Sequence, residues 1–117
     1  RAIPLAVAGA FHSPLMAPAS EGLSAKLAEI EIRPATIPVI ANVKAAPVSQ
    51  LDEIREALVA QLVNPVLWAK SMGGLVEDGV EEFLEPGPGR VLAGLMKKIA
   101  RDRTVVGYPD VASLEEE

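Results

Sequence analysis

Apolar and polar residues follow one another in blocks that predict short strands separated by amphipathic helices. The first apolar run, residues 3–9, is typical of a buried strand. Ser13 and Pro14 come next and predict a helix N-cap and a first helical residue. Pro34 prevents this helix from continuing. Four apolar residues spaced four apart give the helix one apolar face: Leu15, Ala19, Leu23 and Leu27.

The next block predicts a strand, a loop and a second helix. A strand is expected over residues 36–42, where Pro38 indicates an edge position or a late start. Residues 46–48 are expected to be loop. Ser49 and Asp52 resemble a capping box, with Asp in place of the usual Glu, and predict a helix start. The apolar positions of that helix are Leu51, Ile54, Leu58 and Leu62.

The third helix is predicted to start at Asn64 and Pro65, a cap followed by proline, and to end at Gly79. Residues 80–84 read as a strand, and residues 85–89, Glu-Pro-Gly-Pro-Gly, as a turn-rich loop. A fourth helix follows. Its inward positions are expected to be Val91, Leu92, Leu95, Met96 and Ile99.

A last strand is expected over residues 104–107, followed by a frayed acidic tail over residues 110–117. Strands that alternate with helices indicate an α/β layer structure with a mostly parallel sheet. In such sheets, functional sites gather at the carboxyl ends of strands. Three places fit this position: His12, Asn42 and the loop at 87–89.

Composition narrows the classes of function. The chain has 117 residues, half of them apolar, which is enough for one domain with a real core. Its net charge of −5 argues against nucleic acids and anionic membrane surfaces as partners, since both require clustered Lys and Arg. No apolar run approaches the length of a membrane span. Without cysteine, disulfides, thiolate metal sites and cysteine nucleophiles are excluded, and a single histidine argues against a zinc site.

The N-terminal residues have the outline of a signal peptide, with Arg1 before an apolar run that ends Ala-x-Ala. We reject this interpretation because the charged region is one residue long, Pro4 interrupts the apolar run and the chain does not begin with Met. Arg1 is instead expected to be an interior point of a longer chain.

His12 is the only histidine, and it lies where a predicted strand passes into a helix. Histidine exchanges protons near neutral pH, so His12 is a candidate general base. A lone histidine also commonly caps a helix or fills a polar corner. None of the six serines stands in a Gly-x-Ser-x-Gly elbow, and Ser13 is expected to cap the helix. A nucleophile for His12 would therefore lie outside this stretch, and periodicity does not identify the group that orients the ring.

The Gly87–Arg90 loop precedes a predicted helix and could hold a phosphate at the helix N-terminus. It lacks the spacing of either phosphate-loop pattern. The favoured interpretation is a tight strand-to-helix turn with Arg90 in solvent.

Four motifs in the same order and spacing resemble one enzyme family, the malonyl-CoA:acyl carrier protein transacylases and the related acyltransferase domains of polyketide synthases. Gly-Ala-Phe-His-Ser-Pro-Leu-Met, from residue 9, resembles the family's histidine motif. The other three are Pro-Val-Ile-Ala-Asn-Val at 38–43, Gln-Leu-Val-Asn-Pro-Val-Leu-Trp at 61–68, and Glu-Pro-Gly-Pro-Gly-Arg-Val-Leu-Ala-Gly-Leu at 85–95. The resemblance covers nearly the whole chain but only the C-terminal part of a full transacylase.

The resemblance implies a fold and a reaction. Residues 1–9 would be the last strand of a ferredoxin-like insert, and residues 10–117 the C-terminal part of an α/β-hydrolase-like acyltransferase core. A serine in a Gly-His-Ser-x-Gly elbow would take malonyl from coenzyme A and pass it to the phosphopantetheine thiol of acyl carrier protein. No permanently bound cofactor is implied, and the location would be cytoplasmic.

The resemblance also assigns three residues. His12 matches the catalytic histidine, and Gln61 the position whose main-chain carbonyl accepts the other imidazole N–H. Phe11 matches a position associated with malonyl preference, where a ring would crowd an α-methyl branch.

The serine elbow and the arginine that would pair with malonate are absent from residues 1–117, so this stretch alone is expected to be inactive and to need the N-terminal part of the same enzyme. Two alternatives remain open: an acyltransferase domain of a polyketide synthase, and a non-catalytic α/β ligand-binding module that uses the Gly-Pro-Gly loop.

Overall fold

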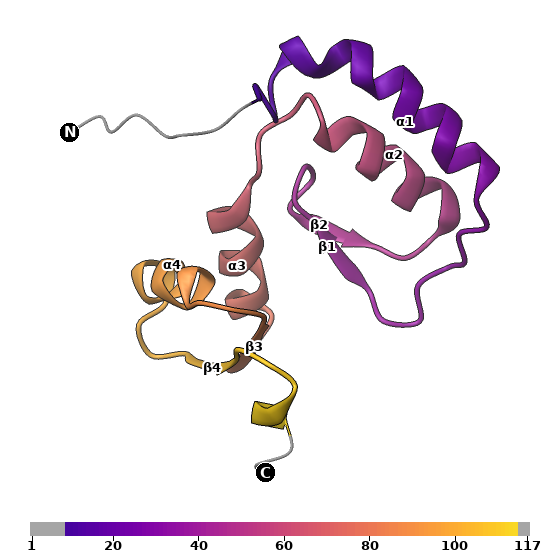
Figure 1. Cartoon of the computed structure of the whole chain (residues 1–117). Coiled ribbons are helices and arrows are strands. Elements are labelled where there is room, and N and C mark those ends of the chain that lie inside the picture. The colour runs from indigo at the N-terminus through magenta and orange to yellow at the C-terminus, as the bar shows by residue number, and fades with distance from the viewer. Residues whose placement is uncertain (1–8, 115–117) are drawn as a thin grey trace. The chain divides into compact units, whose positions relative to one another are not determined.

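A computed structural model describes residues 9–114, and the chain divides into two compact units, Arg1–Trp68 and Ala69–Glu117 (Figure 1). The strand expected over residues 3–9 lies outside the described residues except for Gly9. Among residues 9–114, none of the helices combines the length and the apolar content that a membrane span requires. The fold is α/β, as the alternation of blocks predicts.

Two helices lie side by side in the first unit (Figure 1). A 3-10 turn, Pro14–Met16, leads into α1, Ala17–Glu29, and the second helix is α2, Leu51–Gln61. α1 ends before Pro34, as predicted, and Leu27 is its buried residue. The predicted apolar face is only partly buried: Leu15 is 78% exposed and Ala19 is exposed, whereas Leu23 is half-buried.

Both predicted helix caps are wrong in detail. Ser13 stands at the N-cap position of the 3-10 turn, but its hydroxyl donates back to the carbonyl of Ala10 at 2.7 Å. The capping box of α2 lies one residue later than predicted. Glu53, and not Asp52, accepts the N–H of Gln50 at 3.3 Å, because a reciprocal box needs the acid three residues after the N-cap.

A β-hairpin packs against α2. β1, Val39–Ala41, pairs antiparallel with β2, Ala46–Val48, and Ile40 lies opposite Pro47. The late start after Pro38 is confirmed, whereas the prediction of loop over residues 46–48 is wrong. Proline is tolerated there because both strands of a two-stranded sheet are edge strands. Ala41, Val48 and Ala57 form the buried core of this unit, with Val43 and Ile54 packed against them.

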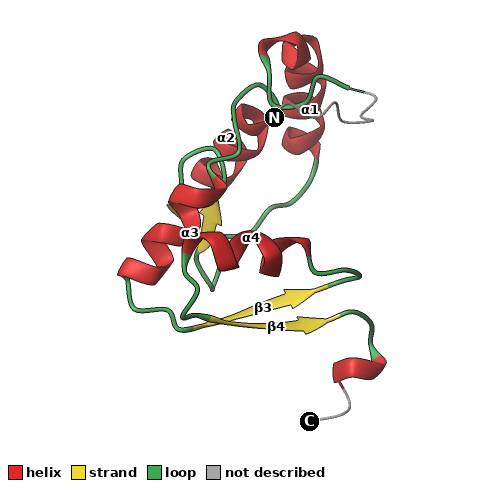
Figure 2. Ribbon diagram, turned by 90° about the vertical axis from the view of Figure 1, so that its left-hand side faces the viewer, coloured by secondary structure: helices red, strands yellow, loops and turns green. Residues whose placement is uncertain are grey.

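The second unit is a parallel strand pair with helices (Figure 2). Its elements are α3, Trp68–Glu77, β3, Glu82–Pro86, α4, Val91–Ile99, and β4, Thr104–Tyr108. β3 and β4 run parallel in the register Glu82↔Thr104 to Pro86↔Tyr108. A 3-10 turn, Ala112–Leu114, follows where a frayed tail is expected.

Three predictions for this unit need correction. α3 begins at Trp68 instead of Asn64, whose side chain binds the carbonyl of Ala60 behind it. β3 begins two residues later than expected and includes Glu85, which is buried. Three of the five positions expected to face inward are exposed, Val91 at 72%, Leu92 at 42% and Leu95 at 38%, whereas Met96 is 2% exposed.

The mostly parallel sheet is confirmed only for β3 and β4. The described strands form two separate two-stranded sheets, and β1 with β2 is antiparallel. The hairpin arises because four residues separate Ala41 from Ala46, too few for the crossover that a parallel pair needs.

Candidate active site

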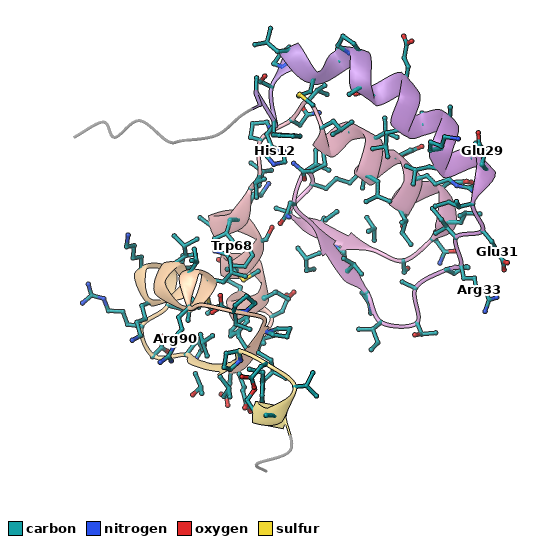
Figure 3. All side chains as sticks on the ribbon, viewed as in Figure 1. His12, Glu29, Glu31, Arg33, Trp68 and Arg90 are labelled. Atoms are coloured by element: carbon teal, nitrogen blue, oxygen red, sulfur yellow. The ribbon has the colours of Figure 1, made fainter. Side chains whose placement is uncertain are left out.

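His12 lies against the C-terminal end of α2 (Figure 3). Its Nδ1 is 2.8 Å from the carbonyl oxygen of Gln61, and its backbone N–H donates to the carbonyl of Leu62 at 3.0 Å. Gln61 is the last residue of α2, where helix carbonyls lack intrahelical partners. One residue thus satisfies two consecutive carbonyls with its ring and its main chain.

The hydrogen bond to Gln61 sets the tautomer of the ring. A carbonyl oxygen only accepts, so Nδ1 carries the proton and Nε2 keeps a lone pair. The side-chain Nε2 of Gln61 is also 3.3 Å from Nδ1, but two donors cannot share that bond, and the shorter contact to the carbonyl prevails. Because His12 is exposed, its Nε2 is free to act as a base toward a hydroxyl or thiol that approaches the ring.

The backbone of His12 is strained. Its φ of 63° lies in the left-handed region, which costs most residues about 1–2 kcal/mol and in which histidine is enriched relative to most residues. Such strain persists where neighbouring contacts hold it, and it gathers at functional sites. The bonds to Gln61 and Leu62 are the contacts that hold it here.

Phe11, beside His12, is 61% exposed. Its ring lies over Gly9, where an added Cβ would stand 2.6 Å from the Phe11 Cε2 atom. The absence of a side chain at Gly9 therefore permits this ring position. The structure thus brings His12 and Gln61 into contact and places Phe11 at the same end of the unit.

The Gly-Pro-Gly loop does not offer an open anion site. The carboxylate of Glu85 accepts the N–H groups of Leu92 and Ala93, each at 2.9 Å, and so fills the N-terminus of α4. Gly87 and Gly89 have φ of 123° and 92°, which this turn requires. The sequence pattern predicts loop at Glu85 and does not indicate this role. One feature of the sequence could have indicated the capping role of Glu85. It is an acidic residue a few positions before a helix whose N-cap residue, Arg90, makes no side-chain cap bond.

Arg90 is exposed (Figure 3), as the tight-turn interpretation predicts. A phosphate at α4 would compete with the Glu85 carboxylate for the same donors, so the phosphate-binding hypothesis is wrong for this helix end.

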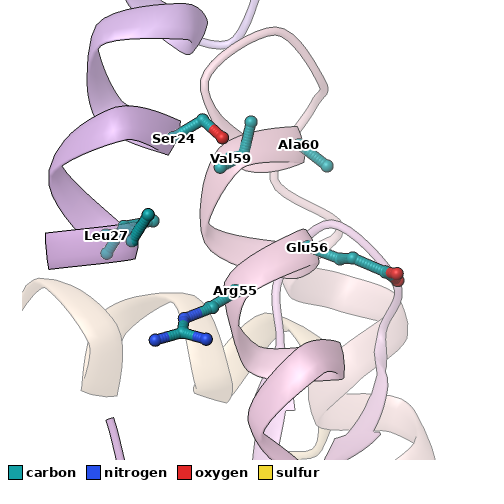
Figure 4. A pocket seen from close by; sticks show the side chains of 7 residues that line it. Ser24, Leu27, Arg55, Glu56, Val59 and Ala60 are labelled. Atoms are coloured by element: carbon teal, nitrogen blue, oxygen red, sulfur yellow. The ribbon is translucent and has the colours of Figure 1, made fainter. Parts of the chain in front are cut away.

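A groove of about 440 Å³ separates α1 from α2 (Figure 4). Arg55 lies in it and donates to the carbonyl of Ile30 at the C-terminal end of α1, at 3.2 Å. This bond ties the two helices together. In the part of the chain that the structure describes, no group of three potential metal-binding side chains is found.

No family model matches the chain, but individual proteins match it closely. It is 44% identical to the malonyl CoA-acyl carrier protein transacylase of Bacillus subtilis, over 98% of the chain and 36% of that protein. An acyl carrier protein S-malonyltransferase from Vibrio cholerae is 42% identical with a TM-score of 0.92, over 98% of the chain and 38% of its own.

A third match is the structure of a type II PKS acyl-carrier protein in complex with its malonyl-transacylase, 43% identical with a TM-score of 0.92, over 98% of the chain and 37% of that chain. The chain thus spans little more than a third of the length of these relatives.

Proposed function

We propose, from the premise that the chain belongs to the malonyl CoA-acyl carrier protein transacylase family, that it supplies the general base of a malonyl transfer. The acceptor would be the phosphopantetheine thiol of acyl carrier protein, and the donor malonyl-coenzyme A. One observation carries this proposal: the 2.8 Å contact between His12 Nδ1 and the Gln61 carbonyl. In the neutral ring this contact leaves the lone pair on Nε2, where a general base needs it.

The first half of the reaction would load a serine supplied by the rest of the enzyme. His12 Nε2 takes the proton of the serine hydroxyl as its oxygen attacks the thioester carbonyl. The C–S bond then breaks, and the imidazolium returns the proton to the coenzyme A thiolate. The Gln61 carbonyl accepts from Nδ1–H throughout and takes the orienting role that a carboxylate has in other triads.

The second half would run the same steps in reverse. The thiol of acyl carrier protein gives its proton to His12 and attacks the acyl-serine, and the serine oxygen leaves with that proton. The imidazolium that forms in each half faces the C-terminal end of α2, where the helix dipole is negative. The match to a carrier protein complex supports this class of partner.

The domain arrangement belongs to the same proposal. Residues 1–9 would end a ferredoxin-like insert, and residues 10–117 would complete an α/β-hydrolase-like core formed with N-terminal polypeptide. Large apolar side chains support this because they stand open in both units, as surfaces that pack against further chain do: Ile37 at 78%, Leu84 at 61% and Val111 at 74%. Parallel strands such as β3 and β4 are also normally covered on both faces.

Phe11 is proposed to favour malonyl over its α-methyl homologue. Its ring is exposed next to His12, where it would crowd a branch at the α-carbon. Crowding of one methyl group is worth roughly 1–3 kcal/mol in other pockets. Because the substrates are coenzyme A and carrier protein thioesters, we place the reaction in the cytoplasm.

The test uses the complete enzyme that carries this chain. We expect His12→Ala to lower malonyl-serine formation at least ~10²-fold, the scale of general-base loss. His12→Asn serves as the matched variant because Asn tolerates the left-handed backbone and keeps the local fold. A near-wild-type rate in both variants, measured by mass spectrometry of the acyl-enzyme, would refute the assignment.

A second test uses the 117 residues alone. They are expected to transfer no malonyl, because they lack the serine elbow. Addition of the N-terminal polypeptide should restore transfer. Activity of residues 1–117 by themselves would contradict the proposed division of the site.

A further inference from the structure

We infer that Pro65, with the side-chain amides of Gln61 and Asn64, positions His12 by keeping the Gln61 carbonyl free and fixed. The inference rests on the proposed function for its effect on the reaction. Its structural part stands on the contacts at the end of α2 alone. These groups act through His12 and are not expected to touch substrate.

Pro65 removes a competitor for the carbonyl. In a continuing α-helix, the oxygen of Gln61 would accept the N–H of the residue four positions later. That residue is Pro65, which has no N–H, so the oxygen stays available to His12 Nδ1 at 2.8 Å. Proline also disfavours helical backbone at Asn64 and so stops α2 at this point.

The side-chain amide of Gln61 hydrogen-bonds to the segment that follows α2. Its Nε2 donates to the carbonyl of Asn64 at 3.0 Å and lies 3.4 Å from that of Pro65. A flipped amide would set its oxygen against these two carbonyl oxygens, so the two contacts favour the donating orientation. Gln61 thus contributes its main chain to His12 and its side chain to the turn that frees that main chain.

The side chain of Asn64 links the turn back to the last turn of α2. Its Nδ2 donates back to the carbonyl of Ala60 at 2.8 Å, and the side chain is half-buried. The N–H of Val63 also reaches the Ala60 carbonyl oxygen, at 3.3 Å, so the last turn is narrow. The hydrogen bonds from Asn64 and Val63 to the Ala60 carbonyl hold this turn, and they fix the directions of the Gln61 and Leu62 carbonyls.

His12 needs such a rigid partner. Its left-handed backbone is held by the Leu62 carbonyl, and its ring by the Gln61 carbonyl. If the end of α2 loosened, the ring could release Nδ1–H and take the other tautomer, with the proton on Nε2. That tautomer has no lone pair on Nε2 to offer a serine.

The experiment uses the complete enzyme and three variants. Pro65→Ala restores the competing N–H. Asn64→Ala removes the tie to Ala60. Gln61→Met removes the side-chain amide and keeps the main-chain carbonyl. The matched control carries the same proline change at an exposed place away from His12, Pro34→Ala.

We expect each of the three variants to lower kcat for malonyl transfer about fivefold to tenfold, the effect of one weakened hydrogen bond. KM for malonyl-coenzyme A should change less than about twofold, since no substrate contact is removed. In ¹⁵N-histidine spectra of the resting enzyme, the His12 signals, assigned by their loss in His12→Ala, should move from the Nδ1–H toward the Nε2–H tautomer. The Pro34→Ala control should match wild type.

The outcomes separate the two proposals. If the folded variants keep both the wild-type rate and the wild-type tautomer, the positioning inference is wrong. If Pro65→Ala fails to fold, Gln61→Met and Asn64→Ala decide. If His12→Ala transfers malonyl normally while the variants still shift the tautomer, the proposed function fails and the positioning of the ring stands.

Discussion

The buried carboxylate of Glu85 accepts two backbone N–H groups at the N-terminus of α4, and its removal should loosen that helix. The side chain is 9% exposed and accepts two backbone N–H groups at 2.9 Å each. Glu85→Gln keeps one acceptor oxygen and turns the other group into a donor that faces an N–H. The variant therefore loses one bond outright and weakens the other.

The expected cost follows from these contacts. A hydrogen bond to a charged group contributes about 1.5–3 kcal/mol, and a carboxylate at a helix N-terminus about 0.3–1 kcal/mol. Glu85→Gln should therefore lower the local stability of α4 by about 2 kcal/mol, which corresponds to roughly 30-fold more frequent opening. Glu82→Gln is the matched control, because Glu82 lies on the same strand and is exposed.

Hydrogen exchange read by NMR measures this opening directly. The amides within α4 should exchange roughly 30-fold faster in Glu85→Gln than in wild type, and those of Glu82→Gln should stay within about twofold. Equal exchange in the two variants would show that the Glu85 contacts do not stabilise the helix. Faster exchange in both would indicate a general charge effect instead of a cap.

Three further predictions concern the hairpin, Phe11 and the Gly-Pro-Gly loop. Ala45 has φ of 50°, so Ala45→Gly should raise the free energy of unfolding, measured by urea titration, by about 0.5 kcal/mol. Ala46→Gly in β2 should lower it. A lower free energy of unfolding in both variants would contradict the strain argument. Gly9→Ala places a Cβ 2.6 Å from the Phe11 ring, so in the complete enzyme the kcat/KM ratio of malonyl to methylmalonyl should fall several-fold. Gly22→Ala is the control, because its added Cβ contacts nothing within 4 Å, and it should leave the ratio unchanged. An unchanged ratio in Gly9→Ala would show that Phe11 does not set the preference for malonyl. Inorganic phosphate should leave the amide shifts of Leu92 and Ala93 in place, since Glu85 occupies those donors; saturable shifts there would restore the anion site.

Apolar spacing predicted where the helices lie, although the predicted caps are wrong in detail. The leucine spacing placed α2 and α4 close to their observed bounds, and Pro34 and Pro38 marked where α1 could not continue and where β1 begins. The same patterns failed at residues 46–48, which form β2 around Pro47. A strand of three residues has too few positions for alternation to be visible, and its partner, not its composition, makes it a strand.

The position of Glu85 could not be read from its neighbours either. Next to Pro86 and Gly87 it belongs to a turn-rich stretch, and only the return of α4 over β3 brings the N–H groups of Leu92 and Ala93 to its carboxylate. The burial of a charged side chain depends on a partner supplied by the fold.

The sequence by itself determined that the chain has one histidine, no cysteine and no serine elbow, and so which chemistry it can contribute. It also determined, through Pro65, that the end of α2 leaves a carbonyl without its helical donor. Only the tertiary structure decided which group takes that carbonyl. His12 and Gln61 are 49 residues apart, and a 2.8 Å contact over that separation depends on how the hairpin and both helices pack. Periodicity reports which face of an element is buried, whereas a hydrogen bond across the chain is set by the folded positions of two elements.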